Sequence, residues 1–486
     1  MNVVPSQIAG DDSELEALPR LFQCNFSPGR LSARRGAVAT AIGPGRVALV
    51  RGAQSDPGMV LFRQTNEMYY LTGVEVAHAC LSIDGDTGVS TLYLANFDAG
   101  HARGAGDYLH ASAPDVAGAL TGFDRVMPIE QLARDVARWA LKPVPPTLMI
   151  PSRPAEGAAT SRDSALFARA AAAADPWSSA VSAESHFATQ LRSSFPTLMV
   201  EDLSPVIDRL REVKDEVEIR LLRRAGMLTA HAVTESMRCT TPGVTEYQLA
   251  AVANFIFLAG GARGEGYRAI VGGGKNTWHG HYGRLSDPLV DGDLVLMDHA
   301  ADFAYYTSDI GRMWPVNGSF TPTQRMLYGF IVQYHRELLS RIGPGVDCWE
   351  LMEEVREVMT PVVDRTAWDS PQHEAAARGA LQFTGHMSHP VGMCVHDVGD
   401  YRSRPLEPGV VMAIDPMIWI PEELQYVRCE DTVVVTADGC EVLTSAAPLD
   451  CDEIELAMRD GSLFDHWDPG AAIARLELAT SSGETR

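Results

Sequence analysis

The sequence lacks long apolar runs and any recognisable export signal. The stretch MNVVPSQIAGDDSELEALPR carries no basic region followed by an apolar core, and no uninterrupted apolar stretch approaches 18 residues. We therefore expect a cytoplasmic protein that is neither exported nor inserted into a membrane.

Positive charge and closely spaced cysteines are also scarce. The chain has 40 Lys and Arg residues against 63 Asp and Glu residues, which gives a formal net charge of −23. Because phosphate binding needs a concentrated basic surface, this balance argues against a nucleic-acid partner. The eight cysteines are scattered from Cys24 to Cys451 without close pairs, so they indicate neither a zinc ribbon nor a disulfide framework.

The C-terminal half contains two acidic patterns of similar design. The first reads DGDLVLMDHAADFAYYTSDIGRMW, and the second reads EPGVVMAIDPMIWIPEELQYVRCEDTVVV. Gly292 lies six residues before Asp298, and Gly409 lies six residues before Asp415. Each glycine opens an apolar run that predicts a buried strand, and the aspartate ends that strand.

Each pattern also contains a second acid. Asp309 follows Asp298 by 11 residues, and Glu430 follows Asp415 by 15. If a hairpin joins each pair, its two acids face each other with Cβ atoms about 5 Å apart. Taken singly, each acid is equally compatible with a solvated turn. Four buried carboxylates together would repel one another without cations, so the pattern favours two metal ions about 3.5 to 4 Å apart.

Two histidine-rich stretches offer nitrogen ligands for the same site. FTGHMSHPVGMCVHDVGD contains His386, His389 and His396, and HGHY contains His279 and His281. The seven-residue spacing of His389 and His396 allows one ring to bind a metal while the other lies over the substrate. The Gly-, Asp- and Pro-containing loop GRLSDPLVDGD allows His281 to reach that site as well.

Five separated blocks occur in a specific order: LVLMD, SDIGRMWPVNGSFT, SH followed by VHDVG, EPG, and RCED. Together they resemble the aminopeptidase P and prolidase family. In addition, RRGAVATAI and GMVLFRQTNEMYYLTGVEVAHACL resemble the start of the N-terminal domain of the aminopeptidase P branch, with a helix, a strand and a Phe-Arg-Gln block before a tyrosine-rich strand. The resemblance implies an α/β protein, in which a creatinase/aminopeptidase P-like N-terminal domain precedes a catalytic domain of the pita-bread fold.

The resemblance also implies roles for individual residues. The matching metal ligands are Asp298, Asp309, His389, Asp415 and Glu430, of which Asp309 and Glu430 bridge the ions. The matching catalytic residues are His281, His396, Asp415 and Arg428, and the substrate-binding residues are His281, His396 and Trp419. Oxygen-rich ligation with a single histidine favours two Mn²⁺ ions over zinc.

Three positions depart from the family pattern, and at one of them, Gly385, many members have a histidine, with His386 here shifted by one residue. The family has glutamate where this chain has Asp415, and aspartate is one methylene shorter. Catalytic geometry is sensitive to shifts of about 1 Å, so this change bears on activity. The family also has a tyrosine where this chain has Trp419, which removes a hydroxyl group from the expected substrate pocket.

The expected activity is metal-dependent release of the N-terminal residue from Xaa-Pro peptides by a homodimer or homotetramer. Two alternatives stay open. One is a same-fold enzyme acting on a small-molecule C–N bond, as creatinase does, or on a C–S bond. The other is a catalytically weak binding homologue. An acid or histidine at every ligand position favours the peptidase.

The resemblance and the turn residues divide the chain into three segments. These are an N-terminal aminopeptidase P-like domain over residues 1–200, a pita-bread metallopeptidase domain over 201–455 and a tail over 456–486. The stretch VIDRLREVKDEVEIRLLRRAGMLTAHAVTESM has apolar residues at helical spacing, which predicts one long helix entering the catalytic domain. The Ala-rich stretch SALFARAAAAADPW predicts a packing helix of the N-terminal domain.

Overall fold

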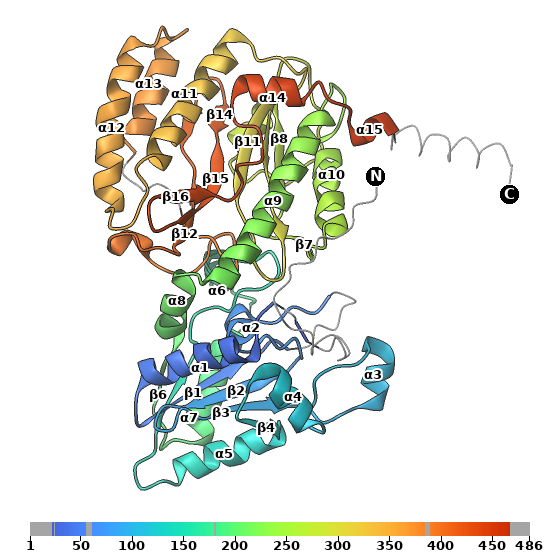
Figure 1. Cartoon of the computed structure of the whole chain (residues 1–486), viewed down its shortest axis with the longest axis vertical. Helices are drawn as coiled ribbons and strands as arrows, with labels where there is room; N and C mark the ends of the chain where they lie inside the picture. Colours follow the sequence, from blue (N-terminus) through green and yellow to red (C-terminus); the bar gives the residue numbers. More distant parts are fainter. Residues whose placement is uncertain (1–21, 24, 55–60, 179–180, 384–388, 467–486) are drawn as a thin grey trace, which may run out of the picture. The chain divides into compact units, whose positions relative to one another are not determined.

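The protein folds into two units (Figure 1). The computed structural model describes residues 22–23, 25–54, 61–178, 181–383 and 389–466. The described residues up to Arg153, together with Val181–Val206, form the first unit, and those from Pro154 to 178 and from Ile207 onward form the second. Both units combine helices with β-sheet, which confirms the α/β class. Among the described residues, no helix has the length and apolarity needed to cross a membrane.

The first unit is built on a six-stranded mixed sheet of order β4-β3-β2-β1-β5-β6. The β1–β2 and β2–β3 pairs are antiparallel, whereas the other three pairs are parallel. Its strands are β1 (Arg46–Arg51), β2 (Cys80–Asp84), β3 (Ser90–Leu94), β4 (Arg125–Pro128), β5 (Thr147–Ile150) and β6 (Val200–Asp202). Its helices are α1 (Pro28–Ile42), α2 (Asn66–Thr72), α3 (Ala99–Ala105), α4 (Pro114–Thr121), α5 (Glu130–Ala140) and α7 (Ala183–Ser194).

The start of this unit differs from the sequence prediction at one element. The predicted helix and strand are present as α1 and β1, but the tyrosine-rich segment forms helix α2 and not a strand. The Thr65 hydroxyl accepts a hydrogen bond from the Met68 N–H at the start of α2, and Gly73 ends the helix with φ +66°. These two caps outweigh the strand preference of the tyrosines.

The second unit contains a six-stranded sheet of order β12-β15-β11-β9-β8, with β16 paired to β15. All its strand pairs are antiparallel, and two short ribbons, β7–β10 and β13–β14, accompany it. The sheet strands are β8 (Ile270–Gly273), β9 (Leu294–Asp298), β11 (Ile310–Pro315), β12 (Val411–Ile414), β15 (Glu430–Val435) and β16 (Cys440–Val442). The ribbon strands are β7 (Gly264–Glu265), β10 (Ala301–Asp302), β13 (Met417–Ile420) and β14 (Gln425–Arg428).

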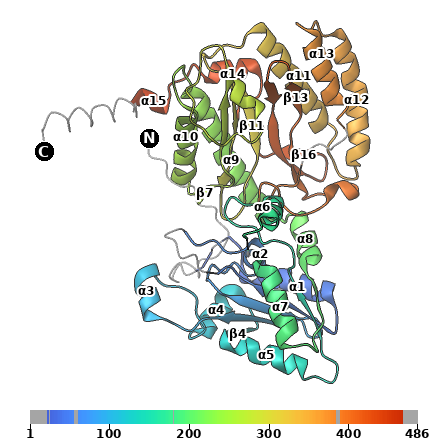
Figure 2. The same ribbon diagram turned by 180° about the vertical axis from the view of Figure 1, so that it is seen from behind.

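Helices cover this sheet in two groups. α9 contacts β11 and α10 contacts β8, whereas α11 contacts β12 and β14, α13 contacts β13, and α12 packs on α11 and α13. Figures 1 and 2 show α9 and α10 on one side of this unit and α11, α12 and α13 on the other. The helices are α6 (Arg162–Ala174), α9 (Glu216–Arg238), α10 (Glu246–Ala259), α11 (Pro322–Leu339), α12 (Cys348–Arg365), α13 (Pro371–Leu381), α14 (Cys451–Ala457) and α15 (Leu463–His466). The core between sheet and helices includes the fully buried Phe257, Trp314 and Tyr328.

The predicted long helix is in fact two helices, α8 (Ser204–Glu212) and α9. A capping box separates them, because the Asp215 side chain accepts from the Val217 and Glu218 N–H groups while the Glu218 carboxylate accepts from the Asp215 N–H. Apolar spacing continues across the break, so periodicity alone hides it. An acid followed three residues later by glutamate is the local signal for a new helix.

The Ala-rich helix also differs from its prediction. It forms α6 but belongs to the second unit and not to the N-terminal one. Arg162, its first residue, makes ion pairs with Glu156 and with Asp208 of α8. A uniform run of alanines does not indicate which core the helix packs against. The two ion pairs of Arg162 attach the helix to the second unit. The predicted domain limits at residues 200 and 455 stay predictions.

Candidate metal centre and active site

The four predicted acids meet where the sheet strands of the second unit end. Asp298 is the last residue of β9, and Glu430 is the first of β15. Gly311 of the central strand β11 is paired with both of them, Asp298 on one side and Glu430 on the other. Asp309 precedes β11 directly, and Asp415 follows β12 directly. The two turn-and-strand patterns therefore bring their carboxylates together, as the sequence predicts.

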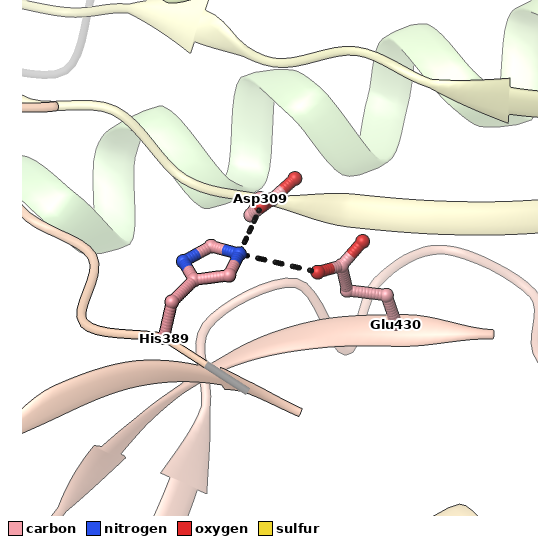
Figure 3. Close-up of side chains that lie close together, drawn as sticks. All are labelled: Asp309, His389 and Glu430. Carbon is pink, nitrogen blue, oxygen red and sulfur yellow. Dashed lines mark ion pairs between the residues drawn. The ribbon is translucent and has the colours of Figure 1, made fainter. Parts of the chain in front are cut away.

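The first part of the cluster, which we call the His389 side, comprises Asp309, His389 and Glu430 (Figure 3). Each residue offers one ligand atom, and these three atoms lie within 4.8 Å of one another. His389 Nε2 is 3.3 Å from Asp309 Oδ2 and 3.9 Å from Glu430 Oε1. His389 Nδ1 lies 3.3 Å from the Pro390 carbonyl, which can accept its hydrogen and leave the Nε2 lone pair free for a metal.

One buried atom on the His389 side is unsatisfied. Within the described part of the chain, Glu430 Oε1 has no hydrogen-bond partner, although Glu430 is fully buried. An unpaired buried carboxylate oxygen is costly, and a cation is the partner that removes the cost. Two carboxylates and one imidazole nitrogen also form a chemically suitable donor set for a divalent ion. The residues present therefore fit the predicted metal.

The second part of the cluster, the Arg428 side, comprises Asp298, Asp415 and Arg428. Arg428 Nη1 lies 2.9 Å from Asp298 Oδ2, and Arg428 Nε lies 2.9 Å from Asp415 Oδ1. Its Nη2 also contacts Glu430. The guanidinium fits here because Gly311 has no side chain: a Cβ at that position would lie 3.0 Å from Arg428 Nε and 3.2 Å from the Glu430 Cβ.

The buried cluster contains more negative than positive charge. Burial raises the pKa of Asp298 to about 7, although Arg428 opposes the rise. The pKa values of Asp415 and Glu430 also rise for the same reason, again against the effect of Arg428. Burial also acts to raise the pKa of Asp309, but the hydrogen bond and charge of His389 outweigh it and lower that pKa to about 2. One guanidinium and one imidazole are too little cationic charge for four buried carboxylates.

Two residues that the sequence analysis missed hold the acids in place. The buried Tyr267 hydroxyl lies 2.5 Å from Asp298 Oδ1 and 2.6 Å from Asp309 Oδ1. The Asp309 N–H donates to Thr432 Oγ1 at 2.6 Å, and the Thr432 hydroxyl donates back to the Asp309 carbonyl at 2.8 Å. Thr432 lies two residues after Glu430 on β15, so strand alternation could have placed it on the same face. No local pattern marks Tyr267.

The two predicted substrate histidines lie near the cluster. The rings of His389 and His396 have centroids 4.2 Å apart. The pKa of His281 is lowered because its ring is partly removed from water and because His396 and Arg428 lie close enough to repel its proton. The structure therefore brings His281 and His396 to the same region as the carboxylates. His279, in contrast, stacks on Tyr282.

Trp419 takes part in an aromatic group beside this region. Its ring centroid is 4.2 Å from that of Tyr426 and 5.1 Å from that of Trp278. A Cβ at Gly280, next to His281, would lie 3.5 Å from the Trp419 ring. Trp419 therefore lies against the loop that carries His281. His386 lies outside the described residues.

A cavity of about 540 Å³ borders both Asp415 and Trp419. Its wall is mostly apolar and comes from α11, α12, α13 and the β12–β13 segment. A pocket of this kind suits an apolar group of a small ligand, with polar groups at one end to orient it. The cavity therefore lies on the side of the cluster where the sequence departs from the family pattern.

Two family profiles match this chain. That of Metallopeptidase family M24 covers residues 220–437, and that of the aminopeptidase P N-terminal domain covers residues 31–143. The chain belongs to the aminopeptidase P family of metallopeptidases. Every residue predicted as a metal ligand or as a catalytic or substrate-binding group falls inside the M24 match. The family implies divalent metal ions, in agreement with the donor set described above.

Relatives and solved structures agree with this assignment. The Xaa-Pro aminopeptidase of Escherichia coli (strain K12) is 37% identical over 277 residues, which are 54% of this chain and 63% of that protein. The Xaa-Pro aminopeptidase 3 of Mus musculus is 29% identical over 415 residues, covering 81% of this chain and 76% of that protein. The structure of E. coli aminopeptidase P with the inhibitor Pro-Leu matches with a TM-score of 0.72 and 29% identity, over 89% of this chain and 98% of that one.

The sequence alignments cover only part of the first two relatives, whereas the structural match covers most of both chains. The chain spans 63% of the length of both the E. coli and the Haemophilus influenzae relatives. The structural match extends over both units and confirms the predicted architecture, an aminopeptidase P-like N-terminal domain with a pita-bread catalytic domain.

Proposed function

We propose that the protein is a metal-dependent aminopeptidase that releases the N-terminal residue from Xaa-Pro peptides. The single observation that carries the proposal is the His389 side, where Asp309, His389 and Glu430 converge and Glu430 Oε1 is buried without a hydrogen-bond partner among the described residues. The names of the relatives supply the peptide substrate and the preference for proline.

Five residues would hold two metal ions: Asp298, Asp309, His389, Asp415 and Glu430. When bound, the ions would supply an acidified water and polarise the scissile carbonyl. We propose Mn²⁺, because the donor set has eight carboxylate oxygens and a single imidazole, which suits a harder ion than zinc.

The remaining groups would bind and orient the peptide. His281 and His396 would hold the substrate beside the ligands, and a ring that donates a hydrogen bond to the developing negative charge would contribute about 3 kcal/mol. Arg428 engages Oδ1 of Asp415, so we assign the transfer of a proton to the leaving nitrogen to Oδ2. Trp419 and the apolar cavity would receive an apolar part of the substrate and exclude water from it.

We also propose that the protein acts in the cytoplasm as a homodimer or homotetramer and does not bind nucleic acid. The acidic balance of the sequence supports the last point. For the oligomer, the support is a group of large apolar side chains exposed on α10, namely Tyr247, Phe255 and Leu258. Light scattering on purified protein tests the oligomeric state directly.

The test of the activity is hydrolysis of a peptide panel by protein freed of metal and then reloaded with Mn²⁺. We expect release of Xaa from Xaa-Pro peptides only after reloading, with little release from Xaa-Ala peptides and none from N-acetylated Xaa-Pro controls. Cleavage of a creatine-type C–N bond in place of peptides would indicate the small-molecule alternative. Metal uptake without turnover of either substrate would indicate a binding homologue, and absence of metal uptake would overturn the proposal.

A further inference from the structure

His396 has a carboxylate partner that no part of the proposed site includes. Its Nδ1 lies 2.5 Å from Oδ2 of Asp163, which stands 233 residues earlier in the sequence. Asp163 lies in the first turn of α6, the Ala-rich helix. An ionised carboxylate only accepts hydrogen bonds, so the Nδ1 atom of His396 carries the hydrogen of this contact. Nε2 is then the ring nitrogen left for any other partner.

Asp163 is itself oriented by its neighbours. Its Oδ1 accepts hydrogen bonds from the Ser161 hydroxyl at 2.6 Å and from the Ser164 N–H at 2.7 Å, which turns Oδ2 toward His396. Partial burial acts to raise the pKa of Asp163, but the hydrogen bonds from Ser161 and His396 outweigh it and hold that pKa below its ordinary value. The carboxylate therefore stays ionised at neutral pH.

A series of buried ion pairs connects the start of α6 to the loop that contains His396. Arg162, which precedes Asp163, lies 3.1 Å from Glu156. Glu156 lies 3.1 Å from Arg211, and Arg211 lies 2.6 Å from Asp397, the residue that follows the histidine. Each of these side chains is at most 10% exposed. Breaking buried pairs is costly, so the start of α6 is held firmly against the histidine loop.

The contact between Asp163 and His396 is partly exposed, with side-chain exposures of 44% and 35%. An ion pair of that exposure contributes little to stability, about 0 to 1 kcal/mol. Its main consequence is therefore the orientation of an imidazole whose neighbour, 4.2 Å away between ring centroids, is the predicted metal ligand His389.

We propose that Asp163 is a positioning residue that fixes the orientation and tautomer of His396. With its hydrogen held on Nδ1 by Asp163, the ring has Nε2 on the edge that faces away from the carboxylate. In the neutral ring that Nε2 is an acceptor, and it becomes a donor only in the charged ring. The consequence for catalysis rests on the proposed function, whereas the tautomer itself does not.

The tautomer is tested without activity, by ¹⁵N NMR of histidine-labelled, metal-free protein at a pH well above the ordinary imidazole pKa. The His396→Ala variant identifies the His396 signals. We expect the wild-type ring to carry its hydrogen on Nδ1, and Asp163→Ala to move it to Nε2, where an unanchored neutral imidazole mostly carries it. Asp175→Ala, at the other end of the same helix, is the matched control and should leave the signals unchanged. A wild-type ring with hydrogen on Nε2 alone overturns the proposal.

The catalytic consequence is tested by a double-mutant cycle on an Xaa-Pro peptide. Asp163→Ala should lower kcat with metal content unchanged, by at most the roughly hundredfold expected for loss of the group that it positions. Asp163→Glu should restore part of that loss. In a His396→Ala background, Asp163→Ala should have no further effect, because a residue that acts through the ring has nothing left to position. If the losses caused by the two single variants add fully in the double variant, Asp163 does not act through His396.

The two proposals fail in different ways. If wild-type protein hydrolyses the peptides but His396 carries its hydrogen on Nε2, the role of Asp163 is wrong and the function stands. If metal-loaded wild-type protein hydrolyses no peptide while the ring is anchored through Nδ1, the proposed function is wrong and the positioning of His396 stands.

Discussion

The two sides of the carboxylate cluster differ in how the negative charge of their buried carboxylates is compensated. On the Arg428 side, a guanidinium lies 2.9 Å from an oxygen of Asp298 and 2.9 Å from an oxygen of Asp415. On the His389 side, Glu430 Oε1 is buried with no hydrogen-bond partner in the described chain. Arg428 thus offsets the charge of Asp298 and Asp415, whereas Glu430 Oε1 stays unpaired and depends on a cation from solution.

This difference has a consequence for the order in which ions bind. A divalent ion at the His389 side meets Glu430 Oε1, a buried oxygen with no hydrogen-bond partner in the described chain, although Arg428 contacts the other Glu430 oxygen. An ion bound by Asp298 and Asp415 meets carboxylates that already contact Arg428, so it gains less from them. We therefore expect unequal affinities, with the tighter ion at the His389 side and the weaker one at the Arg428 side.

The largest effect is expected from removing an acid that serves both sides. Asp309→Ala and Glu430→Ala should each abolish binding of the metal pair and all peptide hydrolysis. Asp291→Asn, an exposed acid that contacts Asn317, is the control and should bind metal like the wild type. Elemental analysis after gel filtration measures the ions retained. Retention of both ions by the Asp309→Ala protein would contradict the shared role.

The next effect concerns the internal cation. Arg428→Met leaves Asp298 and Asp415 buried without their partner, so metal-free protein should lose about 3 to 5 kcal/mol of unfolding free energy. Added Mn²⁺ should recover more stability in this variant than in the wild type, because the ions then meet uncompensated carboxylates. Denaturant unfolding with and without Mn²⁺ measures both changes.

The control for that experiment is Arg223→Met. Arg223 pairs with Glu441 at 2.7 Å, but both side chains are about 40% exposed, so its loss should cost only about 0 to 1 kcal/mol. If the two arginine variants lose equal stability and gain equally from Mn²⁺, Arg428 does not neutralise the site.

A smaller effect separates the substrate histidines from the metal ligand. His281→Ala should lower kcat about a hundredfold with metal content unchanged, as expected for loss of one group that stabilises the intermediate. His389→Ala should lose metal as well as activity. His279→Ala is the matched control, because His279 lies two residues away in the same loop and stacks on Tyr282. Loss of an ion from the His281→Ala protein would make His281 a ligand.

Parts of this site could be predicted because each depended on a short segment of sequence. A turn glycine, an apolar run and an acid define β9 and β12 locally, and antiparallel pairing then brings Asp298 and Asp415 to the same end of the sheet. The helix break at Asp215 was local too, but its capping signal was overlooked in favour of continuous apolar spacing.

Other parts depend on contacts between segments far apart in the chain. Tyr267 reaches Asp298 and Asp309 from a segment with no motif, and Asp163 reaches His396 from a helix of alanines. The central position of Arg428 likewise depends on the missing side chain of Gly311 on another strand. Periodicity and spacing describe a segment's own structure, so they carry no information about such partners.

The smallest expected effect is at Asp415, where the chain departs from its family. The carboxylate is held by Arg428, and the residue borders a cavity of about 540 Å³, so one added methylene has space to enter. Asp415→Glu should therefore be accommodated without loss of stability and should bring the carboxylate closer to the weaker ion. We expect its Mn²⁺ affinity and the rate on an Xaa-Pro peptide to rise by up to about tenfold, which corresponds to about 1.4 kcal/mol. Calorimetric titration of metal-free protein and a peptide assay measure the two changes. A loss of both would mean that the Arg428 side has been rebuilt around aspartate, and the comparison of a strong and a weakened metal position would then fail.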